Sequence, residues 1–128
     1  MKNLLLALLG CLFAQTSFGQ DIDIKKGVVI IDGKPCLKVD GDANNVSFMD
    51  LAGNELFFLK FIHNSKYGPL YTKTTFLAQR LTMTSISYGF TKKLLLKKLL
   101  ADGTLTDCTL VPAKVESFVL KYDEQVER

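Results

Sequence analysis

Few side chains in this sequence can carry out acid–base, nucleophilic or metal chemistry. His63 is the only histidine among 128 residues, and this excludes every motif that needs two histidines, including the zinc-peptidase pattern. Paired with Cys36 or Cys108, it would supply the minimum for a thiol nucleophile. Neither cysteine lies in a local sequence that indicates activation. We therefore predict no catalytic residue and no cofactor.

The same two cysteines have two structural interpretations. In an oxidising compartment, Cys36 and Cys108 can form a disulfide that closes a long loop and stabilises the fold. Alternatively, they are two buried free thiols, because a sequence alone does not place two residues within bonding distance. If the disulfide forms, neither cysteine can serve as the thiol nucleophile considered above.

Carboxylates occur once at a spacing that calcium loops use. Residues 40–44, Asp-Gly-Asp-Ala-Asn, alternate oxygen-bearing side chains as such a loop does. Asn45 then stands where the loop needs glycine, and Leu51 where it needs a bidentate glutamate. Because Asp, Asn and Gly also favour turns, we predict a turn and no metal site. The acidic pair Asp123 and Glu124 lies near a terminus, where mobility argues against a preorganised acid–base site.

Residues 1–19 form a predicted signal peptide. Lys2 precedes an apolar run over residues 4–14, which has the length of a signal-peptide core and is too short to span a bilayer. Small side chains at the end of the leader suit a signal peptidase, and they predict cleavage between Gly19 and Gln20. The leader resembles those of proteins exported by Gram-negative bacteria, so a periplasmic or extracellular location is expected.

A second processing route is lipidation of Cys11, because residues 8–11 resemble the lipobox of bacterial lipoproteins. By either route, residues 20–128 form a single predicted domain with no linker. The chain is 48% hydrophobic, which excludes a disordered protein. Its formal net charge is only +3, and one of these charges, Lys2, belongs to the leader. Such a balance gives no general case for nucleic acid as a partner.

Two hairpins are predicted in the first half of the domain. The β-branched segment 28–31 and the segment 36–39 flank Asp32-Gly33, a dipeptide that favours two-residue hairpin turns. Residues 46–49 and 56–62 flank a glycine-containing loop. The second of these segments is almost entirely apolar, which predicts a central strand covered on both faces along at least part of its length.

The second half of the domain changes from strands to helices. Residues 71–83 predict one long strand or two short ones, whereas residues 112–124 have helical periodicity with proline in the first turn. For residues 104–111 the sequence does not decide between a loop and a short strand. Residues 21–26 are mostly polar and are expected to fray. The fold class is therefore α+β, with an antiparallel sheet of four to six strands, including two N-terminal hairpins, covered on one face by two C-terminal helices.

Residues 92–100, Lys-Lys-Leu-Leu-Leu-Lys-Lys-Leu-Leu, predict a basic amphipathic helix. Such a helix can lie on an anionic membrane surface, or it can bury its leucines against the sheet and solvate its lysines. The second interpretation is favoured here, because so apolar a sheet needs a cover and the helix lacks tryptophan anchors.

Function is predicted mainly by exclusion. The leading hypothesis is an exported, non-enzymatic binding domain whose partner is a protein, a cell-envelope component or a small apolar ligand. The alternative is an envelope-associated protein held by lipidated Cys11 or by the helix over residues 92–100. An enzyme with an unrecognised site is the third hypothesis, because a fold does not fix a function.

Overall fold

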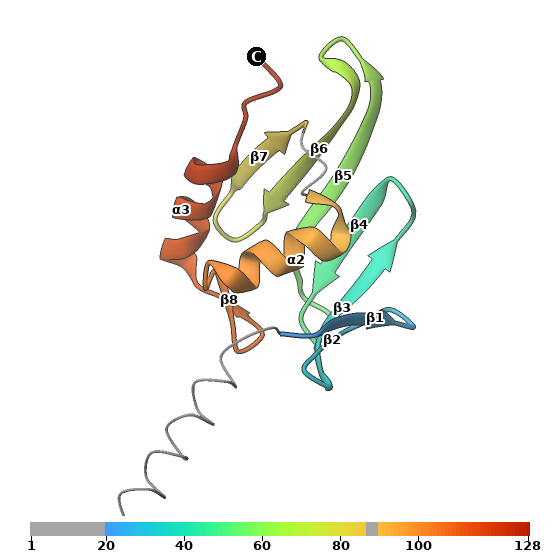
Figure 1. Cartoon of the computed structure of the whole chain (residues 1–128), viewed down its shortest axis with the longest axis vertical. Helices are drawn as coiled ribbons and strands as arrows, with labels where there is room; N and C mark the ends of the chain where they lie inside the picture. Colours follow the sequence, from blue (N-terminus) through green and yellow to red (C-terminus); the bar gives the residue numbers. More distant parts are fainter. Residues whose placement is uncertain (1–19, 87–89) are drawn as a thin grey trace, which may run out of the picture.

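A computed structural model describes residues 20–86 and 90–128 as an antiparallel sheet followed by two helices (Figure 1). Seven strands form one sheet in sequence order. Their bounds are β1 Ile22–Lys25, β2 Val28–Ile31, β3 Lys34–Gly41, β4 Asn45–Met49, β5 Glu55–Ser65, β6 Gly68–Phe76 and β7 Leu81–Ser85. Helix α2 spans Lys92–Ala101, the small hairpin of β8 (Leu105–Thr106) and β9 (Thr109–Leu110) follows, and α3 spans Pro112–Tyr122.

The expected α+β class is confirmed, but the expected strand number of four to six is wrong. The additional strand at the N-terminal edge is β1, in the segment predicted to fray. Ile22 is only 6% exposed and pairs with Ile31, so its apolar side chain anchors the strand. Lys26 and Gly27 have φ angles of 52° and 76°, as a tight turn with positive φ at both central residues requires.

Local turn chemistry explains two other connections. Asp32 and Gly33 both have positive φ, at 52° and 81°, and they join β2 to β3 as the dipeptide predicts. At Gly41 a side chain would collide with the backbone, because an added Cβ would lie 1.9 Å from the Asn45 carbonyl oxygen. Glycine is therefore required where β3 turns towards β4.

One hydrophobic cluster joins the sheet to both helices. Phe48, Phe57 and Phe76 are cross-strand neighbours on β4, β5 and β6, and none of the three is exposed. Phe118 of α3 packs edge-on against Phe76, with ring centroids 6.2 Å apart. The leucines of α2 that lie in the same cluster are Leu95, Leu96 and Leu99, each 0% exposed.

A disulfide links the C-terminal hairpin to the sheet. Cys36 of β3 and Cys108, in the turn between β8 and β9, are joined across 72 residues of sequence, with their Cα atoms 5.2 Å apart. Residues 104–111, which the sequence left open, thus form a short two-stranded hairpin that is covalently fixed to the large sheet.

Candidate functional site

The strand register separates the two faces of the sheet. Side chains alternate along a strand, so the residues next to the buried phenylalanines point to the opposite face, which we call the outer face. One row across it runs through registered partners on five strands: Asp40, Ser47, Phe58, Thr75 and Thr82. A neighbouring row runs from β4 to β7: Asn45, Lys60, Lys73 and Thr84.

A cleft of about 350 Å³ opens on this face around Phe58, and we call it the Phe58 cleft. Phe58 is half-buried, although the residues before and after it, Phe57 and Leu59, are 0% exposed. The cleft is also lined by the aliphatic residues Val46 and Leu59, and by polar, charged or glycine residues: Asp40, Gly41, Asn45, Ser47, Glu55 and Lys60. The cleft therefore combines one aromatic ring with groups of both charges.

The charged groups of the Phe58 cleft have few partners within the described part of the chain. The Lys60 ammonium lies 5.4 Å from the Phe58 ring centroid, a cation–π arrangement, and forms no ion pair with any described residue. Ser47 donates a hydrogen bond to the Glu55 carboxylate. A ligand can thus meet an ammonium group and two carboxylates around an aromatic ring.

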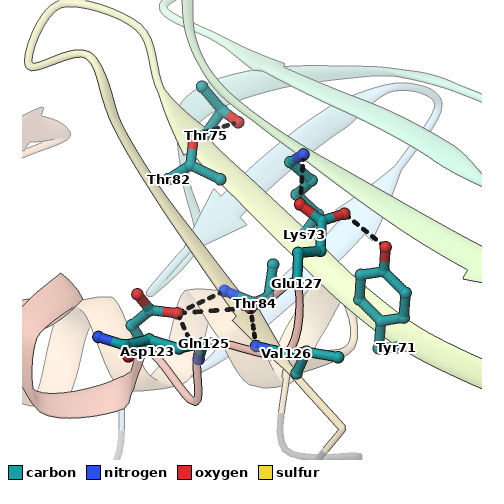
Figure 2. A network of polar contacts seen from close by, with 9 residues as sticks. All are labelled: Tyr71, Lys73, Thr75, Thr82, Thr84, Asp123, Gln125, Val126 and Glu127. Atoms are coloured by element: carbon teal, nitrogen blue, oxygen red, sulfur yellow. Dashed lines mark hydrogen bonds and ion pairs between the residues drawn. The ribbon is translucent and has the colours of Figure 1, made fainter. Parts of the chain in front are cut away.

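A second polar site lies where residues 123–128, the C-terminal tail, pass the edge of β7 (Figure 2). The Thr84 amide donates to the Asp123 carboxylate at 3.0 Å, and the Thr84 carbonyl accepts the Glu124 amide at 2.8 Å. Ile86 donates its amide to the Glu124 carboxylate at 2.9 Å. The tail therefore satisfies the outward-facing backbone groups of an edge strand.

Glu127 fastens the tail to the outer face (Figure 2). Its carboxylate accepts a hydrogen bond from the Lys73 ammonium at 2.8 Å and another from the Tyr71 hydroxyl. The Lys73 bond, with the Tyr71 bond second, holds the pKa of Glu127 below its ordinary value. The carboxylate in turn raises the pKa of the Tyr71 hydroxyl, mainly through the hydrogen bond. Lys73 thus has an acidic partner, whereas the adjacent Lys60 forms no ion pair with any described residue.

Replacing Glu127 with glutamine is expected to destabilise the protein by less than about 1 kcal/mol at neutral pH, because the ion pair is partly exposed. The folded state lowers the pKa of Glu127, so its contribution is full above the ordinary value of 4.5 and disappears as pH falls through the lower folded pKa. Urea unfolding between neutral pH and about pH 3 measures the difference between the two proteins. Glu116→Gln, at an exposed position on α3, is the control. A Glu127→Gln effect that grows towards low pH would contradict the assignment.

The residues that the sequence selected for chemistry do not come together as a catalytic set. Cys36 and Cys108 are joined in a disulfide, so neither supplies a thiolate for His63. The His63 ring instead hydrogen-bonds the Asn44 side chain, with Nε2 and Oδ1 2.9 Å apart. The predicted leader with Cys11 and Gly19 lies outside the described residues.

The calcium-like segment serves as a turn. Asp42 accepts the backbone amides of Asn44 and Asn45 at 2.8 and 2.9 Å, and these bonds lower the pKa of its carboxyl group. Within residues 20–86 and 90–128, no three His, Cys, Asp or Glu side chains gather as a metal site. The carboxylate at the third position of the calcium-like pattern is thus occupied by the chain's own amides.

The role of the tail was missed at the level of sequence. Asp123 and Glu124 follow directly after a helix, and a terminal position alone suggests mobility. The sequence feature that could have indicated their role is the threonine-rich strand β7, whose open edge needs partners. The sequence does not show, however, that the two segments, about 40 residues apart, meet.

Comparison of the chain with protein-family models, curated protein sequences and solved structures gives no match. The helices within the described residues are too short, or too polar, to cross a membrane. Functional inference therefore rests on the geometry of the outer face and of the tail.

Proposed function

We propose that this chain is an exported, non-enzymatic binding module that recognises a partner protein through its outer face. In this proposal, α2 and α3 cover the face bearing Phe48, Phe57 and Phe76, and they leave the opposite face for the partner. The contact between Phe76 and Phe118 supports this arrangement. Six of the seven residues in the segment 56–62 are apolar, a composition expected for a strand covered on both faces.

The Phe58 cleft is the observation on which the proposal depends. An aromatic ring that is half-buried in a cleft, surrounded by polar groups, has the composition of a protein-binding hot spot. Lys60 and the carboxylates of Asp40 and Glu55 would orient the partner, because charges around an apolar centre fix its register. The long strands β5 and β6 hold Phe58 and Thr75 side by side on a rigid support.

Other ligands fit these surfaces less well. A small apolar ligand would contact Phe58 but make no use of the exposed charged groups beside it, Asp40, Glu55 and Lys60. A membrane would require the leucine face of α2, but Leu95, Leu96 and Leu99 are each 0% exposed. The disulfide between Cys36 and Cys108 agrees with an oxidising compartment, and therefore with export.

Site-specific photocrosslinking tests this function. A benzophenone amino acid at Thr75, next to Phe58 across the strands, is expected to form a discrete protein adduct in the cells that naturally make the chain. The same probe at Leu120, 85% exposed on α3, is the matched control and should give none. Adducts of equal yield from both positions would refute an outer-face interface.

Replacing Phe58 with alanine is the accompanying test. Loss of an aromatic hot spot costs about 2 kcal/mol, or about thirtyfold in affinity. The Thr75 adduct should therefore fall several-fold, and binding of the purified partner should weaken by the full factor. Leu120→Ala removes an exposed apolar side chain of similar size and should change neither. An adduct unaffected by Phe58→Ala would show that the Phe58 cleft is not the binding site.

A further inference from the structure

The outward edge of β7 is capped by side chains more than by a strand. The Thr84 and Ile86 amides donate to the carboxylates of Asp123 and Glu124, at 3.0 and 2.9 Å. One backbone pair, from the Glu124 amide to the Thr84 carbonyl, completes the contact. Because the open edge of a strand is a template for another extended segment, the tail occupies a position that suits a strand.

The surface on which the tail lies, which we call the seat of the tail, also prefers a particular charge. Val126 donates its amide to the Thr84 hydroxyl at 2.7 Å, and this places Glu127 against Lys73 and Tyr71. Lys73 is the registered neighbour of Lys60, so two lysines lie side by side on the outer face at this point. An acidic side chain is needed there to offset their repulsion.

Polar contacts hold the tail on this surface, with little apolar burial. Its only apolar side chain is that of Val126, which is half-buried, and Gln125 lies in the left-handed region at φ 50°. A cleft of about 290 Å³ remains between the tail and β7, along Thr82 and Thr84. Because the tail buries little apolar surface and holds one residue in an unfavourable backbone conformation, a segment without this strain and with more apolar contact would fit the same surface better.

We propose that this seat is a docking groove for an acidic, extended segment of a partner protein, and that the C-terminal tail occupies it as an intramolecular substitute. The partner segment lies extended along β7, where one of its backbone amides donates to the Thr84 carbonyl as the Glu124 amide does. Its carboxylates take the amides of Thr84 and Ile86 and the ammonium of Lys73. The groove is distinct from the Phe58 cleft and does not depend on the function proposed above.

Binding of the tail in trans tests the groove. The chain truncated after Tyr122 is titrated with the synthetic hexapeptide of residues 123–128, and the amide resonances of Thr84 and Ile86 are followed by NMR. Saturable shifts are expected with a dissociation constant of about 0.1 mM, roughly tenfold below the millimolar effective concentration that a short tether supplies. The untruncated chain should bind the peptide at least about tenfold more weakly, because its own tail competes.

Three controls define the chemistry of the groove. The peptide carrying Glu127→Gln, and the truncated chain carrying Lys73→Met, should each lose up to about fivefold in affinity, as expected for a partly exposed ion pair. Phe58→Ala should leave peptide binding unchanged, because Phe58 does not line the groove. This variant therefore separates the test of the groove from the test of the outer-face interface. Equal binding of a scrambled peptide, or no saturable shift in a folded truncated chain, would overturn the proposal.

A full-length variant decides the matter if the truncated chain does not fold. Glu127→Gln weakens the tail but keeps the whole chain, and the native hexapeptide should then shift the Thr84 and Ile86 resonances. No such shift in this variant would also overturn the proposal. If the edge of β7 instead forms dimers that the peptide does not dissociate, the groove accepts a second copy of the chain, and the peptide-partner proposal is wrong.

Discussion

Replacing Cys36 and Cys108 together with alanine is expected to lower the free energy of unfolding by about 4 kcal/mol, because the disulfide closes a long loop. The bond spans 72 residues of sequence, and a loop of this length greatly restricts the unfolded chain. The loss should be seen in urea unfolding as a lower midpoint, with a slope that rises if the unfolded chain expands.

The choice of alanine keeps other effects small. Cys36 is 3% exposed within the hydrophobic cluster, where serine would bury an additional hydroxyl. Cys108 has φ 61°, so alanine retains the same backbone strain, whereas glycine would relieve about 1 kcal/mol of it. Reductant should destabilise the native protein by a similar amount and leave the double variant unaffected. A variant that stays within about 1 kcal/mol of the oxidised protein would contradict a stabilising role for the bond.

Elements specified by local chemistry were predictable from the sequence. The turn at Asp32-Gly33 requires positive φ, and the dipeptide supplies it. Pro112 begins α3 as expected, although the helix ends at Tyr122 and not at residue 124. It ends earlier because Asp123 leaves the helical conformation and accepts the Thr84 amide. The difference comes from a contact with a distant strand.

Features that depend on distant contacts were not predictable. The sequence offered a Cys36–Cys108 disulfide as one of two interpretations, and only the fold decides between them, because the hairpin of β8 and β9 places Cys108 beside β3. The same holds for Glu127 and Lys73, which are 54 residues apart. At β5 the apolar run predicted a strand covered on both faces along at least part of its length. Phe58, on the outer face, is only half-buried.

This contrast within β5 leads to the second large effect. Phe57→Ala is expected to lower the free energy of unfolding by about 3–5 kcal/mol, the usual cost of removing a fully buried aromatic side chain. Phe57 is 0% exposed. Its ring stacks on Phe48 with centroids 4.6 Å apart and lies 5.5 Å from Phe76. Truncation would leave a cavity between two rings that are themselves fixed by their neighbours, so the core cannot collapse to fill it.

Phe58→Ala is the matched control, because it makes the same change one residue further along the same strand. Phe58 is half-buried on the outer face and lines an open cleft, so its truncation leaves no enclosed cavity and should cost about 1 kcal/mol. Urea unfolding of the two variants measures the difference between the faces. Similar costs would mean that the faces are buried alike, and would weaken the case for an interface at Phe58. If Phe57→Ala is strongly destabilising and Phe58→Ala is not, the aromatic ring at position 58 contributes little to folding. Its presence on the outer face is then better explained by binding.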